Sequence, residues 1–239
     1  MMRLDKFIAD TTGVTRSQAG KEIRSGSALV NGIHVRKPEQ RIDETSDTIT
    51  VSGKVCEYCR FHYYMLNKPT GVITAAKDPK QKTVMDLFPM EIRKWGVSPV
   101  GRLDKDTSGL LLLTDNGEFA HRIISPKSEV DKVYLAVVDG ILSPEDILRF
   151  REGIVLVDGT KCLPAKLEII NEQECIVTVR EGKYHQVRRM LAALGKPVCS
   201  LKRVAIGPLR LGTYLLEGQY RPLTEQELCI MFKLLHMEK

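Results

Sequence analysis

Residues 101–117 read GRLDKDTSGLLLLTDNG, in which a charged, glycine-containing segment is followed directly by an uninterrupted apolar run. Leu110–Leu113 is long enough for a buried strand, and the Asn116-Gly117 pair predicts a turn with positive φ before a helix that begins near Glu118. Asp104 then lies in the loop that enters the strand. Such loops often hold catalytic groups, although an Asp there is commonly only a turn or capping residue. Asp104 is therefore a candidate catalytic carboxylate.

Strand and helix patterns alternate on both sides of this stretch. The first strand of a large domain is expected at 61–66. Further strands are expected at 132–138, 154–157, 166–170 and 175–179, and helices at 144–151 and 184–194. This mixture predicts an α+β fold.

Residues 1–52 have the pattern of a separate small domain. Leu4, Phe7 and Ile8 share one face of a first helix, and Thr15-Arg16-Ser17-Gln18 predicts a capping box at the start of a second. Residues 28–35 predict a hairpin around an Asn-Gly turn, and 48–51 a further strand. Residues 53–60 are then a polar linker, and residues 61–239 form the larger domain.

The charge of the chain favours a polyanionic partner. The formal net charge is +6, and the small domain carries basic residues that could form one surface: Arg16, Lys21, Arg24, Arg36, Lys37 and Arg41. Such a surface would bind backbone phosphate. An ordinary solvated helix face is the alternative.

Six cysteines raise the question of metal. Cys56 and Cys59 form the only close pair, with His62 nearby, and a zinc site would need a fourth ligand. Reduced thiols and no metal are expected. No run approaches the roughly 18 apolar residues of a membrane span, and the first residues lack the apolar region of a signal peptide, so a soluble cytoplasmic protein is expected.

The GRLDKDTSGLLLLT stretch resembles the signature of the bacterial ribosomal-RNA pseudouridine synthases. Four more motifs follow the same family in order and spacing: LNKPTG at 66–71, KVY at 132–134, EGKYHQVRRM at 181–190 and GQYRPLT at 218–224. The N-terminal segments MRLDKFIA, TRSQA, IRSG and VNG resemble the S4 RNA-binding domain. The resemblance implies a mixed, largely antiparallel sheet with an RNA-binding cleft.

The resemblance also implies the catalytic residues. Asp104 matches the essential aspartate, and Tyr134 matches a tyrosine that packs on the uracil. Arg188 matches the basic residue that pairs with the aspartate and orients it. Taken alone, Tyr134 has the pattern of a core tyrosine with a solvated hydroxyl, and Arg188 that of a solvated helix face. No cofactor is expected, because a positioned carboxylate can act at the sugar carbon without one.

Seven basic residues are expected to contact RNA. Arg102 matches a family arginine near the extruded nucleotide, and Lys68 in the Asn-Lys-Pro turn is expected to meet the RNA backbone. Arg189 is expected on phosphate, and His185 on RNA or as a cap that positions its loop. The small domain contributes Arg16, Lys21 and Arg24.

Within the family, the opening and closing motifs are most similar to the enzymes of small-subunit (16S) ribosomal RNA. The expected substrate is this RNA or a partly assembled small subunit, and the expected protein is a monomer. A 23S rRNA enzyme and a noncatalytic RNA-binding assembly factor are the alternatives. A nucleosidase that releases the base could use the same aspartate.

Overall fold

The computed structural model describes residues 1–56 and 58–238, which divide into two compact units. The first comprises Met1–His62 and Phe88–Val97, and the second Tyr63–Leu87 and Ser98–Lys239. The S4-like region thus forms a unit of its own, together with the segment that carries helix α3 (Met90–Lys94).

The N-terminal unit packs two helices against short antiparallel strands. Its helices are α1 (Leu4–Thr12) and α2 (Arg16–Ser25). Its strands are β1 (Met2–Arg3), β2 (Ala28–Val30), β3 (Ile33–Val35), β4 (Arg41–Ile42), β5 (Ile49–Val51) and β6 (Lys54–Cys56). Strand β1 pairs with β4, and the other four form a sheet in the order β3-β2-β5-β6. The predicted capping box is confirmed: Thr15 accepts a hydrogen bond from the Gln18 amide, and the Gln18 side chain accepts one from the Thr15 amide.

The linker predicted at residues 53–60 is wrong at its beginning. Ser52 and Gly53 have φ of 49° and 80°, and this tight turn folds β6 back onto β5. The polar composition of the segment signalled a connection, whereas the Ser-Gly turn continues the sheet by one more strand.

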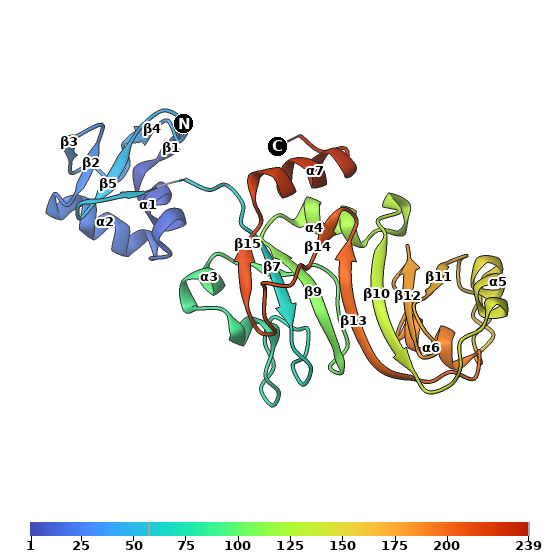
Figure 1. The fold of residues 1–239 in the computed structure, drawn as a ribbon. Coiled ribbons are helices and arrows are strands. Elements are labelled where there is room, and N and C mark those ends of the chain that lie inside the picture. Colours follow the sequence, from blue (N-terminus) through green and yellow to red (C-terminus); the bar gives the residue numbers. More distant parts are fainter. Residues whose placement is uncertain (57, 239) are drawn as a thin grey trace. The chain divides into compact units, whose positions relative to one another are not determined.

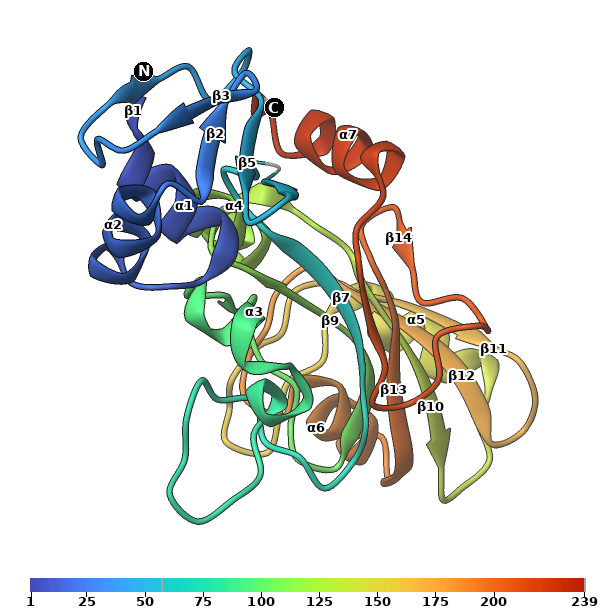
Figure 2. The same ribbon diagram turned by 90° about the vertical axis from the view of Figure 1, so that its left-hand side faces the viewer.

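The second unit is built on one mixed sheet (Figure 1). Its strands are β7 (Tyr63–Lys68), β8 (Ser98–Pro99), β9 (Thr107–Thr114), β10 (Lys132–Val138), β11 (Lys166–Ile169), β12 (Glu174–Val179), β13 (Val198–Ile206), β14 (Leu209–Arg210) and β15 (Tyr220–Pro222). The main order is β11-β12-β10-β13-β9-β7-β15, with β14 on β13 and β8 on β9. Only the β9–β13 pair among these described strands is parallel. The α+β, largely antiparallel fold is confirmed, and the strands twist strongly across the sheet (Figure 2).

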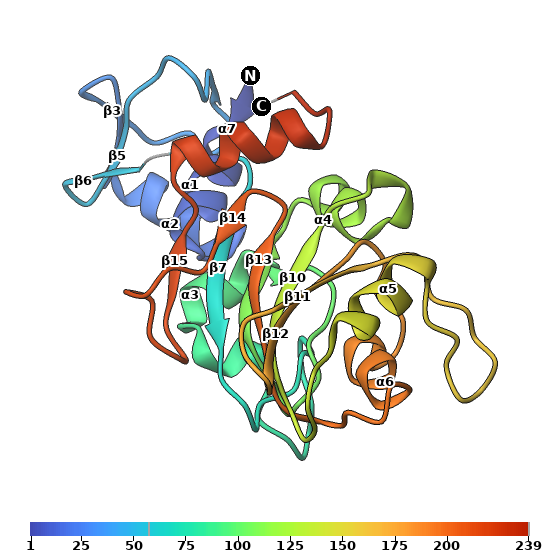
Figure 3. The same cartoon turned by 45° about the vertical axis from the view of Figure 1, so that its right-hand side comes forward.

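Four helices cover apolar parts of this sheet. Helices α5 (Pro144–Glu152) and α6 (Gln186–Ala192) lie beside its β11–β12 end (Figure 3) and close one core with Phe150 and Met190. Helices α4 (Gly117–Ile124) and α7 (Glu225–Leu234) close a second core with Phe119 and Phe232. Two short 3-10 turns, η1 (Val84–Leu87) and η2 (Pro126–Ser128), complete the unit. The leucines of β9 are buried throughout, which explains the uninterrupted apolar run.

Three local expectations differ from the structure. Asn116 is an N-cap with φ of −85° whose side chain accepts a hydrogen bond from the Phe119 amide, so the Asn-Gly pair starts α4 instead of forming a positive-φ turn. The segment 154–157 makes only an isolated bridge between Val155 and Lys161. Helix α6 begins at Gln186, because His185 adopts a left-handed conformation with φ of 48°.

Candidate active site

Two side chains from elsewhere in the chain, Lys68 and Thr74, hold the main chain of the loop that carries Asp104. The Lys68 ammonium donates hydrogen bonds to the carbonyls of Asp104 at 3.0 Å and Thr107 at 2.9 Å. The Thr74 hydroxyl donates to the Leu103 carbonyl at 2.7 Å and accepts from the Leu103 amide at 3.1 Å. The backbone of the loop is thereby held while the Asp104 side chain, about one third exposed, stays accessible.

Lys68, predicted to meet the RNA backbone, lies in the interior of the unit and not on its surface. The residue is fully buried at the end of β7, and its third hydrogen bond goes to the Pro69 carbonyl at 3.0 Å. Burial lowers the pKa of Lys68 to about 8, against the favourable charge of Asp104. The Asn-Lys-Pro motif thus provides an internal clamp for the Asp104 loop, which sequence reasoning mistook for a surface cation.

A cavity of about 300 Å³ opens beside Asp104. It is lined by residues of four separate segments, among them Arg102, Asp104, Tyr134, Tyr184 and His185. A cavity of this size lies at the lower end of the range for small-molecule sites. The structure therefore brings the predicted aspartate and tyrosine to one cavity, although Asp104 lies in the loop before β9 and Tyr134 lies in β10.

The side chain that contacts the Asp104 carboxylate is His185, whereas Arg188 pairs with Asp106. The His185 Nε2 lies 3.3 Å from Asp104 Oδ1. The Arg188 guanidinium instead pairs with Asp106 Oδ2 at 3.0 Å and donates to the Asp106 and Val198 carbonyls at 3.2 Å each. The predicted Arg188–Asp104 pair is thus wrong in this structure. Arg188 lies one turn further along α6 than His185, and it contacts the loop at Asp106, two residues after Asp104.

Tyr134 is positioned by a residue that sequence reasoning missed. Arg203 lies opposite Tyr134 in the β10–β13 pairing, is 4% exposed, and donates from one terminal nitrogen to the Tyr134 hydroxyl at 3.4 Å. Its Nε donates to the Leu110 carbonyl at 2.7 Å. Its guanidinium carbon also lies 6.0 Å from the Tyr134 ring centre, within cation–π range. Arg203 thus links the tyrosine to β9, and nothing in the local sequence distinguishes it from a solvated strand residue.

The EGKYHQ motif is braced by two buried polar side chains. Glu181 Oε1 accepts hydrogen bonds from the Gln186 side-chain amide at 2.7 Å and from the Leu163 amide at 2.8 Å. The Gln186 side chain in turn accepts a hydrogen bond from the Lys183 amide at 3.0 Å. Glu181 also pairs with the Lys183 ammonium. These contacts fix the turn that presents His185 to Asp104.

The remaining predicted RNA contacts are divided between the two units. Arg102 is exposed at the cavity. Arg189 is partly exposed and pairs with Asp158. In the N-terminal unit, Arg16 pairs with Asp5 at 3.1 Å, an interaction that helps lower the pKa of Asp5 to about 2, after the larger effect of the hydrogen bond from Arg3. Lys21 and Arg24 are exposed on α2. Their contacts with RNA stay predictions.

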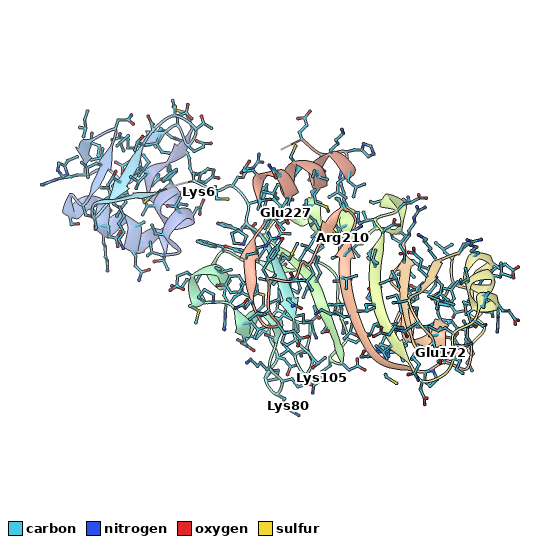
Figure 4. The ribbon with its side chains drawn as sticks, in the orientation of Figure 1. Lys6, Lys80, Lys105, Glu172, Arg210 and Glu227 are labelled. Atoms are coloured by element: carbon cyan, nitrogen blue, oxygen red, sulfur yellow. The ribbon has the colours of Figure 1, made fainter. Side chains whose placement is uncertain are left out.

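Further basic side chains surround the Asp104 loop. Lys80 and Lys105 lie at the same end of the sheet (Figure 4), and Lys105 donates a hydrogen bond to the Gln81 side chain at 2.9 Å. Lys77 and Lys82 of the same neighbouring loop are exposed as well. The Asp104 loop and the loop bonded to it by Lys105 thus carry exposed cations that suit a phosphate backbone.

Neither a metal cluster nor a membrane span is found in the part of the chain that the structure describes. No three His, Cys, Asp or Glu side chains gather there in a way that could hold a metal ion. No helix in the same residues is long and apolar enough to cross a bilayer.

The lowered pKa of Lys68 predicts a pH-dependent contribution to stability. The unfolded chain keeps the Lys68 proton up to about pH 10.5, whereas the folded chain releases it near pH 8. The unfolded state therefore binds more protons than the folded state between these pH values. As pH rises through this window, the contribution of Lys68 to the free energy of unfolding increases, by at most about 3 kcal/mol. In urea unfolding at pH 7.5, 9 and 10, the free energy of unfolding of the wild type should increase relative to that of the Lys68→Met variant as pH rises. Lys105→Met, on the exposed side of the same loop, should run parallel to the wild type, and equal pH dependence of all three proteins would contradict the assignment.

Comparison with known proteins identifies the family of the chain. Residues 62–193 match the model of the RNA pseudouridylate synthases, and residues 2–49 match the S4 domain. An uncharacterized RNA pseudouridine synthase of Bacillus subtilis (strain 168), YtzG, is 39% identical over 234 residues, covering 96% of this chain and 98% of the relative. Ribosomal small subunit pseudouridine synthase A of Escherichia coli (strain K12) is 40% identical over 230 residues, covering 95% and 98%. A crystal structure of a pseudouridylate synthase, 39% identical, superposes with a TM-score of 0.68 and covers 97% of this chain and all of that one. The chain therefore belongs to the RNA pseudouridylate synthase family and carries an N-terminal S4 domain.

Proposed function

We propose that the protein isomerises a uridine of small-subunit (16S) ribosomal RNA to pseudouridine, with Asp104 as the nucleophile. The observation that carries this proposal is the shared cavity of Asp104 and Tyr134 in a chain of the pseudouridylate synthase family. The loop clamp supports it further, because a reactive carboxylate benefits from a rigid backbone and a free side chain.

The reaction needs one carboxylate and no added atoms. In the proposed route, Asp104 donates an electron pair to C1′ of the ribose while the N1–C1′ bond breaks and uracil leaves with its electrons. The uracil then turns, C5 bonds to C1′, and the carboxylate is released. The proton on C5 is lost and N1 gains one, so substrate and product have the same composition. A nucleophilic carboxylate of this kind is established chemistry for glycosidic bonds.

The neighbouring residues are assigned supporting roles. The base must leave its stack to reach Asp104, and Tyr134 is half-buried in the cavity wall where an extruded uracil could pack on its ring. Arg188 acts as a positioning residue through its pair with Asp106, and His185 through its contact with Asp104. No cofactor is assigned to the reaction.

The small-subunit target rests on relatedness. The E. coli relative is named for the small ribosomal subunit, and its similarity extends over both domains of this chain. We assign the free RNA or a partly assembled small subunit as substrate, in the cytoplasm, and a monomer as the working form.

The N-terminal unit is assigned to RNA backbone binding through Lys21 and Arg24. Removing two phosphate contacts should lower the slope of log affinity against log salt by about 1.5–2 and leave the turnover of bound RNA unchanged. The Lys21→Ala, Arg24→Ala double variant tests this by titration with a 16S rRNA fragment at several salt concentrations. Arg149→Ala, Arg151→Ala, an exposed pair on α5, is the matched control. An unchanged slope in the α2 variant would remove these residues from the RNA surface.

Pseudouridine-specific chemical mapping tests the proposal directly. Ribosomal RNA is compared from cells with the wild-type protein, cells without it and cells carrying Asp104→Asn. One 16S uridine that loses its signal in both altered strains is the expected result. Loss of the signal at a 23S position would support the same reaction with 23S rRNA as the substrate. No change at any position would favour a noncatalytic assembly factor, and free uracil among the products in vitro would indicate a nucleosidase.

A further inference from the structure

An exposed aromatic side chain at the cavity has no role in the reaction described above. Tyr184 is 75% exposed although it lines the same cavity as Asp104. A tyrosine that served only the protein core would bury its ring. Its position instead leaves a large flat apolar surface open beside the reacting group.

The turn that carries Tyr184 is held by hydrogen bonds. Residues 183–186 form a turn closed by a hydrogen bond from the Gln186 amide to the Lys183 carbonyl at 3.2 Å, and the Gln186 side chain closes it a second time. Tyr184 is therefore presented by a turn that is braced at both ends. A surface held in this way loses little freedom when a ligand packs on it.

One side of the ring is already stacked. The Tyr184 and His185 rings lie 3.9 Å apart at an angle of 16°. His185 in turn reaches Asp104, at 3.3 Å. The three side chains thus form a continuous row from the nucleophile to the solvent, and the Tyr184 ring is its outer, exposed end.

The charges around this row suit a nucleotide. Arg102 lines the same cavity and is exposed, and the Lys183 ammonium, which pairs with Glu181, lies next to Tyr184 in the turn. Flat aromatic rings next to cations are the standard means of holding an unpaired base and its phosphate. An apolar peptide would use the ring but not the cations.

We propose that Tyr184 stacks on the base of an unpaired nucleotide directly next to the reacting uridine. This inference rests on the proposed function and adds a requirement for the substrate: the target uridine must be flanked by at least one base free to leave its stack. The uridine itself is assigned to Tyr134 and Asp104, since both lie in the cavity wall and are less exposed than Tyr184. A uridine within a continuous helix would then be a poor substrate, because two bases would have to unstack.

Fluorescence of 2-aminopurine tests the stack without relying on turnover. The probe is placed in turn on each side of the uridine that the wild-type protein protects from chemical probing in a 16S rRNA fragment. Wild-type protein and Tyr184→Phe should quench the probe at one of the two positions, and Tyr184→Ala should not. Tyr214→Ala is the matched control, because Tyr214 is 80% exposed but does not line the cavity. Equal quenching by Tyr184→Ala and wild type would overturn the proposal.

Steady-state kinetics give a second readout. Loss of one base–aromatic stack should raise KM about 5- to 100-fold in Tyr184→Ala with little change in kcat, and Tyr184→Phe should restore it. An abasic nucleotide at the quenched position should raise KM for the wild type by a similar factor and leave Tyr184→Ala unaffected. If the abasic nucleotide and the Tyr184→Ala substitution each raised KM by their full factor when combined, the proposal would be overturned. Tyr184-dependent quenching by a wild-type protein that converts no uridine would instead refute the proposed function and leave the stacking intact.

Discussion

The Asp104→Asn protein should bind its RNA within about 3-fold of the wild type and turn it over at least 10³-fold more slowly. The substitution preserves shape, and the contacts that hold the loop use the Asp104 main-chain carbonyl, which the variant keeps. Only the carboxylate is lost, and an amide is a far weaker nucleophile. Single-turnover conversion and equilibrium binding of the same 16S rRNA fragment measure both quantities.

Asp106→Asn is the matched control for this experiment. It lies in the same loop, its side chain is 64% exposed, and it contributes an ion pair with Arg188. Arg188 keeps its hydrogen bonds to the Asp106 and Val198 main-chain carbonyls in this variant, so a loss of turnover below about 10-fold is expected. If Asp106→Asn lost as much as Asp104→Asn, or if Asp104→Asn kept a tenth of its turnover, the assignment of the nucleophile would be wrong.

Gly109→Ala should lower the free energy of unfolding by about 3 kcal/mol or more. Gly109 has φ of +106°, and an added Cβ would lie 2.2 Å from the Arg203 carbonyl oxygen. The clash is with backbone, which cannot rotate away, and the alanine would also occupy a strained conformation. Strand β9 would have to separate from β13 where Gly109 lies opposite Arg203, close to the Asp104 loop in the chain.

Urea unfolding of Gly109→Ala beside Gly117→Ala measures this effect. Gly117 begins α4 at a φ open to any residue, and a Cβ there meets nothing within 4 Å. Alanine at that position should be neutral or stabilising by up to about 1 kcal/mol, since it restricts the unfolded chain. Equal unfolding midpoints for the two variants would contradict the close approach of β9 and β13.

Local signals predicted the elements well where each carried its own physical cause. The apolar run of β9, the strand at 132–138 and the capping box at Thr15 each depend on residues close in sequence, and all three are confirmed. Asn116 misled because Asn favours both positive-φ turns and helix N-caps, and only the following helix decides between them.

Side-chain partners in the site depended on residues far apart in the chain. The motifs predicted that Asp104 and Tyr134 share one cavity. They did not predict that Lys68 is buried and donates hydrogen bonds to three carbonyls, or that Arg188 pairs with Asp106. Arg203 gave no signal at all, because its importance comes from lying opposite Tyr134 in the sheet. Such pairings are set by register, which local sequence does not encode.

From the parallel pairing of β9 with β13 we expect the enzyme to become active late in its own synthesis. The Arg203 hydrogen bond to Leu110 joins residues 93 positions apart, so β9 has an open edge until most of the chain has left the ribosome. Contacts of such long range form late, and domains generally complete their folding as units. The N-terminal RNA-binding domain has no such dependence within its own sheets. A nascent chain is therefore expected to hold RNA before it can modify it.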